Sequence, residues 1–218
     1  MMWQRNPMKD EKGYLTDEQM DKVLEIAGQR SIRDLMLLVT LAYTGRRVSE
    51  IVRGTGGHGI KPQDIDYNSG NITYNIMKKN RRTKQQIIEK QPHSIPIRKS
   101  LPCNPKLLLV LKKFIDDHKI QPDQFIFDMT SQWAGLIIAA IGREAGIGLV
   151  GSRPLHPHHF RHTFAVNITR VSMATPEDLK ELQNLLQHSS IDMTMEYLRY
   201  GHTRARELVG ELSYGKGL

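Results

Sequence analysis

The sequence predicts a mainly α-helical fold with a small three-stranded antiparallel β-sheet packed at one side. Apolar residues recur at helical spacing through most of the 218 positions. A stretch of alternating apolar residues near position 74 interrupts that pattern and predicts strands. The composition, 39% hydrophobic and 25% charged, is that of an ordinary globular protein. The length of 218 residues fits one domain with a real core, or at most two small ones.

Two helices are predicted in the first quarter of the chain. Thr16 and Gln19 have the spacing of a capping box, so the first helix begins after Thr16, and we expect Gly28 to end it. The second begins at Ser31, is apolar nearly all round, and ends at Gly45, as expected for a buried core helix. Residues 1–15 are predicted to form a flexible N-terminal arm.

The sheet is predicted to follow a glycine-rich loop at residues 54–59, and its strands are expected at 64–66, 72–76 and 94–97. Pro96 marks the last strand as an edge, because proline cannot donate to a neighbouring strand. The tip between the second and third strands, residues 78–91, is basic and polar.

The rest of the chain is predicted to be helical. Helices are expected at residues 105–114, 131–146, 158–170, 176–186 and 191–199, with a short buried piece at 124–127. The main domain is expected to span residues 16–200. A short amphipathic tail, residues 201–218, contains Leu208, Val209 and Leu212 and is a candidate oligomerisation segment that can equally fold back on its own core.

Charge and cysteine content restrict the class of partner and compartment. The chain has 31 Lys and Arg against 23 Asp and Glu, a formal net charge of +8, which favours a polyanion such as nucleic acid. A single cysteine excludes a disulfide within the chain and a multi-cysteine zinc site, so we expect a cytoplasmic protein. No apolar stretch approaches the roughly 20 residues that a membrane span needs.

Four short patterns in order carry the functional signal. The chain has Thr44-Gly45-Arg46-Arg47-Val48-Ser49-Glu50, then Lys78, then His158 and Arg161 three apart, then His188 and Tyr197 nine apart. Each pattern is weak alone. Together, over about residues 16–201, they resemble the catalytic domain of tyrosine recombinases, the phage-integrase and Xer-like family, whose order is Arg, Lys, His-x-x-Arg, His or Trp, Tyr.

The resemblance implies a set of site residues. The catalytic residues would be Arg47, Lys78, His158, Arg161, His188 and Tyr197. Glu50 would orient Arg47 or His158, and Lys79 competes with Lys78 as the hairpin lysine. Arg46 departs from the family pattern, in which Leu or Met is usual at this position. The phosphate backbone of DNA would be contacted by Lys79, Arg81, Arg82 and Lys84.

The chemistry implied is strand cleavage and rejoining without metal, cofactor or ATP. Tyr197 would attack a phosphodiester and form a 3′-phosphotyrosyl link that stores the bond energy. Arg47 and Arg161 would each fork onto the non-bridging oxygens in the transition state. Lys78 would protonate the leaving oxygen, His158 would serve as base or proton store, and His188 would donate to the phosphate.

The expected partner is double-stranded DNA, with a homo-tetramer on synapsed DNA and a monomer when free. Two alternatives to a site-specific recombinase remain: a related DNA-relaxing or hairpin-forming tyrosine transesterase, and a catalytically silent DNA-binding module. The chain is interpreted either as an excised catalytic domain or as a minimal recombinase. His158 and His162 also have the spacing of two zinc ligands, but no Glu lies between them and Arg161 does, so we predict no metal site there.

Overall fold

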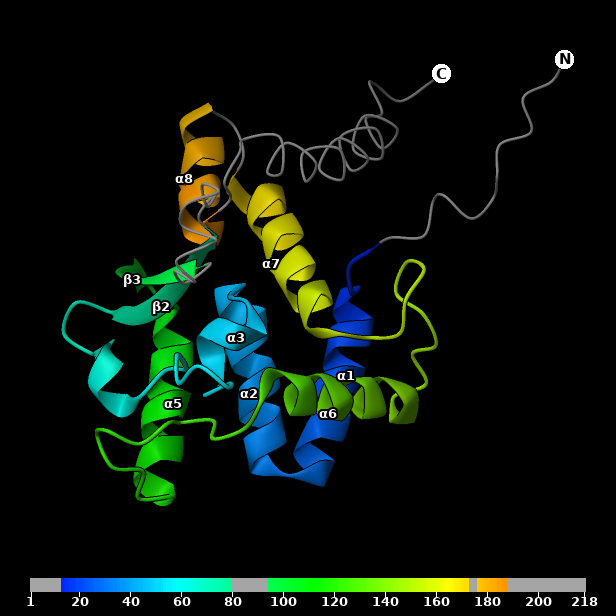
Figure 1. Ribbon diagram of the computed structural model, residues 1–218. Helices are drawn as coiled ribbons and strands as arrows, with labels where there is room; N and C mark the ends of the chain where they lie inside the picture. Colours follow the sequence, from blue (N-terminus) through cyan, green and yellow to red (C-terminus); the bar gives the residue numbers. More distant parts are fainter. Residues whose placement is uncertain (1–12, 80–93, 173–175, 188–218) are drawn as a thin grey trace, which may run out of the picture.

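The computed structural model describes residues 13–79, 94–172 and 176–187, and confirms the predicted fold class. Figure 1 shows the sheet at one side of the molecule and the pair α1 and α6 at the other. The described elements, in chain order, are α1 (Asp17–Arg30), α2 (Ile32–Thr44), α3 (Val48–Ile51), the 3₁₀ turn η2 (Pro62–Asp64), β1 (Ile65–Asp66), β2 (Asn71–Lys79), β3 (Ser94–Pro102), α5 (Pro105–Asp117), α6 (Ser131–Glu144), α7 (Pro157–Ser172) and α8 (Pro176–Leu186).

The start of α1 is the predicted capping box. The Thr16 hydroxyl accepts a hydrogen bond from the Gln19 amide at 3.2 Å, and the Gln19 side chain accepts one from the Thr16 amide at 3.0 Å. The predicted stop at Gly28 is wrong, since α1 continues to Arg30. A glycine inside a helix costs only about 1 kcal/mol relative to alanine, and tertiary packing readily overrides that cost.

Ser31 forms the whole connection between α1 and α2. Its amide donates to the carbonyl of Ala27 at 3.0 Å, which closes the end of α1. Its hydroxyl accepts from the amide of Asp34 at 3.0 Å, which caps the start of α2 as predicted. One extended residue therefore ends one helix and begins the next.

The sheet has the order β1-β2-β3 and is antiparallel throughout. Because β3 pairs only with β2 among the described strands, Pro96 lies in an edge strand as predicted, opposite Met77. The second strand runs further than expected: Lys78 pairs with Ile95 and Lys79 with Ser94 in the strand register. The basic tip was predicted to begin at residue 78, whereas the backbone of both lysines belongs to β2.

The later helices follow the sequence closely. Asn104 caps α5, with Pro105 in its first turn. Helix α6 ends at Glu144, and Gly146 follows it with φ of +70°. Helix α8 has the predicted bounds, and α7 begins at Pro157 and ends at Ser172. The predicted helix at 191–199 and the tail at 201–218 lie outside the described residues.

Two apolar clusters hold these elements together. The larger one joins α1, α2, α3, the sheet, α5 and α6. The smaller one joins α7 and α8 around Val166 and Leu182 and includes Tyr14. The amide of Leu15 donates to the hydroxyl of Thr163 at 2.9 Å. Tyr14 and Leu15, which we expected to be the end of a flexible arm, are thus buried, Tyr14 in the cluster of α7 and α8 and Leu15 in the larger cluster.

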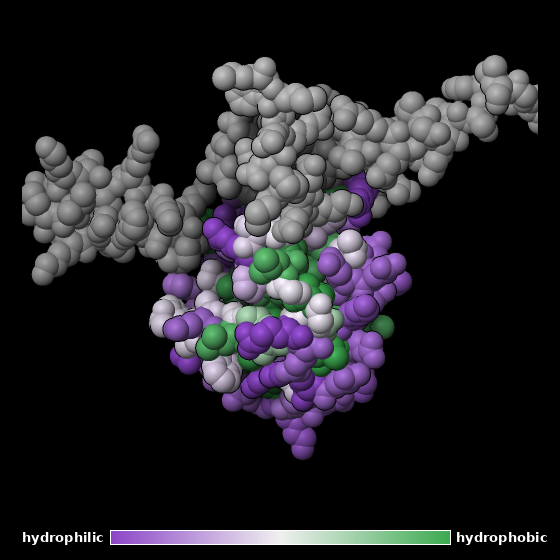
Figure 2. Space-filling view, turned by 90° about the vertical axis from the view of Figure 1, so that its right-hand side faces the viewer, coloured by the Kyte–Doolittle hydropathy of each residue, from purple (hydrophilic) through white to green (hydrophobic). Residues whose placement is uncertain are grey.

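The outer surface mixes polar and apolar side chains. Figure 2 shows one face on which apolar side chains are visible between hydrophilic ones, as on most globular proteins. Among the described helices, none combines the length and the apolar character needed to cross a membrane.

Candidate active site

The end of α2 approaches α7 at a glycine. Gly45 closes α2 in the left-handed conformation, with φ of +59°, and its amide donates to the carbonyl of Leu41 at 3.0 Å. A Cβ at this position would lie 2.4 Å from Cδ1 of Phe164 on α7. The turn conformation and the close packing therefore both require glycine, and they fix where the following residues of the chain begin.

Arg161 joins three helices at this point. Its Nη1 donates to the carbonyl oxygen of Gly45 at 2.8 Å, and its Nη2 donates to the carbonyl oxygen of Leu186. These carbonyls lie at the ends of α2 and α8, where acceptors have no partner within the helix. Because the Arg161 residue is only 4% exposed, it acts as a buried clamp that holds the ends of α2 and α8 against α7.

Glu50 holds Arg47 in place through hydrogen bonds. The Glu50 carboxylate accepts from Nη1 of Arg47 at 3.0 Å and from its amide at 3.3 Å. The carboxylate is buried, whereas the Arg47 side chain is 35% exposed. Of the two partners considered for Glu50, the structure shows Arg47. The short helix α3, which the sequence did not reveal, places the two residues one turn apart.

A second arginine lies beside this pair and was missed as a functional candidate. Arg46 is 2% exposed, with Nη1 at 3.8 Å from the Glu50 carboxylate, and its guanidinium carbon lies 5.5 Å from the centre of the Tyr74 ring. Burial lowers the pKa of Arg46. Its Nη1 has no hydrogen-bond partner among the described residues. The signal available in the sequence was its departure from the usual Leu or Met.

His158 lies near enough to Arg47 and Arg161 for both positive charges to lower its pKa. Partial burial lowers the pKa of His158 below its ordinary value, and the positive charges of Arg161, Arg47 and Arg153 lower it further. Such effects are strong only at short range. The structure thus brings His158, Arg47 and Arg161 together, and keeps the imidazole neutral near pH 7, able to accept a proton.

Two further histidines build the first turn of α7. Nδ1 of His156 accepts from the amide of His158 at 3.2 Å, and Nδ1 of His159 accepts from the amide of His156 at 3.2 Å. The rings of His156 and His159 are 3.8 Å apart. Burial, and then the charges of its neighbours, lower the pKa of His159 to about 4. His156 therefore acts as the N-cap that orients the backbone of His158.

The structure describes only some of the remaining predicted site residues. The structure gives the backbone of Lys78 and Lys79 in β2. Arg81, Arg82, Lys84, His188 and Tyr197 lie outside the described residues.

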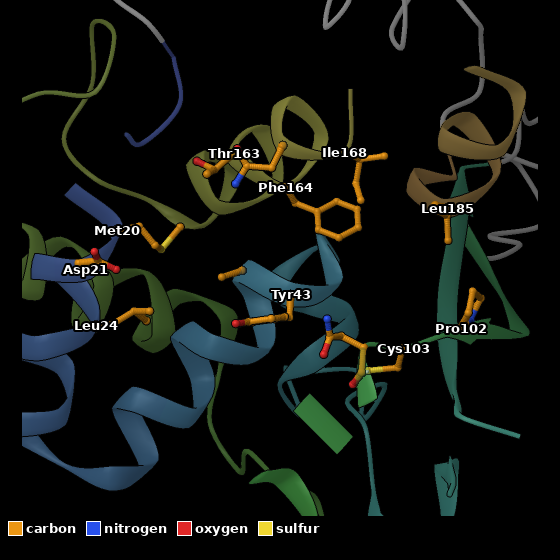
Figure 3. A pocket seen from close by; sticks show the side chains of 13 residues that line it. Met20, Asp21, Leu24, Tyr43, Pro102, Cys103, Thr163, Phe164, Ile168 and Leu185 are labelled. Carbon is orange, nitrogen blue, oxygen red and sulfur yellow. Dashed lines mark hydrogen bonds between the residues drawn. The ribbon is translucent and has the colours of Figure 1, made fainter. Parts of the chain in front are cut away.

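A cavity of about 560 Å³ lies apart from these residues. Figure 3 shows Tyr43 of α2, Phe164 of α7 and Leu185 of α8 around it, facing Met20 and Leu24 of α1. Within the described part of the chain, its lining includes none of the predicted site residues. A mostly apolar cavity does not suit a phosphate, whereas the group formed by Arg47, His158 and Arg161 does.

Known proteins resemble this chain in both sequence and structure. The chain is 27% identical over 202 residues to tyrosine recombinase XerA of Pyrococcus furiosus, covering 89% of this chain and 60% of that protein. The chain thus spans about 60% of the length of this curated relative. The structure resembles that of XerA recombinase with a TM-score of 0.67 and 20% identity, over 98% of this chain and 68% of the other.

A second solved structure that resembles the chain is the XerH site-specific recombinase bound to its difH substrate in a pre-cleavage complex. The TM-score is 0.57 at 18% identity, over 85% of this chain and 50% of the other. At such identity these structures establish the shared fold. The family model described as the phage integrase family matches residues 13–204. Since this match takes in all of the described residues, including those clustered around Arg161, the chain belongs to the phage integrase family.

Proposed function

We propose that this chain is a site-specific DNA recombinase that cleaves and rejoins strands through a 3′-phosphotyrosyl intermediate on Tyr197. The observation that carries the proposal is the hydrogen bond from Arg161 to the carbonyl of Gly45. It fixes the His-x-x-Arg turn of α7 beside the loop that presents Arg47. Two guanidinium groups and the imidazole of His158 thereby share one site, which is the arrangement that a phosphate in transfer needs.

The two arginines stabilise negative charge on the phosphate in this proposal. The Arg47 side chain is 35% exposed and its Nη1 is held by Glu50, so its other N–H groups can face a substrate. Arg161 is held in place by the carbonyls of Gly45 and Leu186, and we propose that its guanidinium acts on the same phosphate as Arg47. A rigid planar fork of this kind favours two oxygens of one phosphate.

His158 serves as the proton acceptor for Tyr197. A lowered pKa keeps the ring neutral at pH 7, and a neutral imidazole can take the phenolic proton as the nucleophile attacks. His188 is proposed to donate to the phosphate. In support, His188 comes two residues after Leu186 in the sequence, and the carbonyl of Leu186 is held by Arg161.

We assign the general acid to Lys78 rather than Lys79. Ile72, Tyr74 and Ile76 are buried on the side of β2 that contributes to the core, and α3 packs against this strand. Alternate residues of a strand share a face, so position 78 belongs to the same series as these three. Position 79 belongs to the opposite series, where a contact to the DNA backbone is the better assignment.

The partner in this proposal is double-stranded DNA. The net charge of +8 favours it, and XerH is described as bound to its difH substrate. Lys79, Arg81, Arg82 and Lys84 are proposed to contact phosphates. Residues 16–200 form the catalytic domain, and residues 201–218 join copies into a tetramer on synapsed DNA. The setting is the cytoplasm. We propose no metal or cofactor, since protein cations neutralise the phosphate.

The test uses supercoiled plasmid in excess EDTA, with wild type beside Tyr197→Phe and with Tyr200→Phe as a matched control three residues away. Wild type and Tyr200→Phe should relax the plasmid and remain covalently bound to DNA after denaturation, whereas Tyr197→Phe should do neither. Activity that survives in Tyr197→Phe but not in Tyr200→Phe would move the nucleophile to Tyr200. DNA binding without relaxation or trapping by any variant would replace the enzyme with a silent binding module.

Partner exchange separates a recombinase from a relaxing enzyme. Sites would be selected from a random duplex library by covalent trapping, and two copies of a selected site would then be placed on one plasmid. Inversion or excision between the copies is the result expected of a recombinase. Trapping at the site without exchange would support the relaxing or hairpin-forming transesterase.

A further inference from the structure

We propose that Arg46 is a positioning residue that offsets the charge of Glu50 from inside the protein, so that Arg47 presents a full positive charge to the phosphate. The inference rests on the proposed function of the site. The inference goes beyond the proposed function because it assigns a role to a buried arginine at a position where the family pattern has an apolar residue.

The geometry shows one carboxylate shared by two guanidinium groups. Glu50 is hydrogen-bonded to Arg47 at 3.0 Å and 3.3 Å, and lies 3.8 Å from Nη1 of Arg46, beyond hydrogen-bond distance. With Arg47 alone, the pair would carry no net charge. With Arg46 added, the cluster carries one positive charge, and the more exposed of its two cations is the one that faces the site.

Burying the charge of Arg46 costs free energy of desolvation, so its presence in the core calls for an explanation. The residue is 2% exposed, and its Nη1 lacks a hydrogen-bond partner among the described residues. Arginine does not lose its proton in proteins, so this cost cannot be avoided by neutralisation. Apolar side chains often replace a whole buried ion pair with no loss of stability, and Glu50 would still be paired with Arg47 if position 46 were apolar. A fold that keeps the cation here is better explained by an electrostatic purpose than by packing.

Tyr74 provides the other wall of the Arg46 site. The guanidinium carbon of Arg46 lies 5.5 Å from the centre of the Tyr74 ring, a cation–π distance. Burial raises the pKa of Tyr74, so the phenol stays neutral and does not cancel the charge. Tyr74 stands on β2, four residues before Lys78. Arg46 thus also joins the loop that carries Arg47 to the strand that carries the proposed acid.

The test measures binding of tungstate, a phosphate mimic, to the full chain by calorimetry, beside the melting temperature of each variant. Arg46→Met and Arg47→Met are matched, since the same change is made one position apart. Arg47→Met should abolish binding. Arg46→Met should weaken it about tenfold, the scale of one unit charge acting on another over about 12 Å at an effective dielectric constant near 20. The melting temperature of Arg46→Met should stay unchanged or rise.

A rescue separates charge from packing. Glu50→Gln keeps an oxygen that can accept from Arg47 but removes the negative charge. In the double variant Arg46→Met with Glu50→Gln, the cluster again carries one positive charge, so tungstate affinity should recover to within about threefold of wild type. A packing role for Arg46 predicts no recovery. Arg46→Lys, which keeps the charge, should also bind within about threefold of wild type and covers the case in which Arg46→Met does not fold.

The inference is overturned if Arg46→Met binds tungstate as wild type does, or if the double variant binds no better than Arg46→Met. It is also overturned if a loss of binding in Arg46→Met is accompanied by an equal loss in Arg46→Lys. The proposed phosphate site itself fails if wild type binds no tungstate or if Arg47→Met binds as well as wild type. These results are distinct, because the second group concerns only wild type and Arg47→Met, whereas the first group is read only when wild type binds tungstate and Arg47→Met does not.

Discussion

The guanidinium of Arg161 on α7 and the carbonyl oxygen of Gly45 at the end of α2 are joined by a hydrogen bond of 2.8 Å. Arg47 comes two residues after Gly45. The two arginines proposed to bind the phosphate are therefore connected through the backbone at Gly45 and not through a shared acidic side chain. Their separation is therefore set by the packing of two helices, which holds the site ready before any substrate arrives.

Arg161→Ala and Arg47→Ala should differ in stability and agree in activity. The first leaves the carbonyls of Gly45 and Leu186 buried without this donor, so the free energy of unfolding should fall by about 2–4 kcal/mol. The second removes one hydrogen bond from the Glu50 carboxylate, which keeps the bond from the Arg47 amide and the charge of Arg46 nearby, so the fall should be smaller, about 1 kcal/mol.

Both variants should lose at least about a hundredfold in cleavage. Urea denaturation and a covalent-trapping assay would measure the two quantities separately. Equal destabilisation by both variants would contradict the clamp that we assign to Arg161.

Gly45→Ala should destabilise the domain and reduce activity together. Alanine is strained at a φ of +59°, and its Cβ would lie 2.4 Å from Cδ1 of Phe164. We expect a loss of about 2–3 kcal/mol in the free energy of unfolding, from strain and overpacking combined.

Adding Phe164→Leu should recover part of this loss, because it removes the steric conflict and leaves only the backbone strain. Thermal melts of the single and double variants would measure the coupling. A purely additive result would show that the contact with Phe164 is unimportant.

Lys78→Ala and Lys79→Ala should affect different steps. Because a general acid contributes about 10²–10⁴-fold, Lys78→Ala should slow strand cleavage by at least about a hundredfold with little change in DNA affinity. Lys79→Ala should leave the cleavage rate of bound DNA nearly intact. It should weaken binding more at low salt than at high salt, because losing a phosphate contact makes the affinity less dependent on salt.

A substrate with a 5′-bridging sulfur at the cut position checks the assignment, since a thiolate leaves without needing a proton. This substrate should restore cleavage by Lys78→Ala. Restoration in Lys79→Ala instead would reverse the assignment.

The histidines at the start of α7 should make stability depend on pH. The pKa values of His156, His158 and His159 are all lowered by folding, that of His159 to about 4. The unfolded chain thus takes up these protons more readily, so this stability is fully present above about pH 6.5 and is lost as the pH falls toward 4.

For His159 alone we expect a loss on the order of 2 kcal/mol between pH 7.5 and pH 4.5, measured by urea denaturation. His159→Asn keeps an acceptor for the amide of His156 but does not titrate, so its stability should fall less over the same interval. An equal fall in both proteins would exclude His159 as the source.

Local signals in the sequence predicted the elements well where a side chain bonds to its own backbone. The capping box of Thr16 and Gln19, the cap of Ser31 and the left-handed Gly45 each act within four residues, so each is visible in a short stretch. Gly28 misled because the same residue type also occurs inside helices. The four residues of α3 are too few to show a period.

The site was predictable as a set of residue types, but its geometry was not. The order of Arg47, His158 and Arg161 is visible in the sequence. The carbonyls that Arg161 binds lie 116 and 25 residues away, and nothing local indicates them. Arg46 was overlooked as a functional residue because a charged residue is expected at the surface, and only its partners in space, Glu50 and Tyr74, show that it is buried.

The single-residue connection at Ser31 limits how this domain can vary in length. Each residue added to or removed from a helix turns the next part of the chain by about 100°. An insertion between α1 and α2 would therefore rotate Gly45 away from Phe164 and separate Arg47 from Arg161, although it lies a whole helix away. Length changes should be tolerated instead in the loop at residues 54–59, where the chain leaves the packed helices. The number of residues from Thr16 to Arg47 should therefore be fixed if Arg47 is to stay beside Arg161.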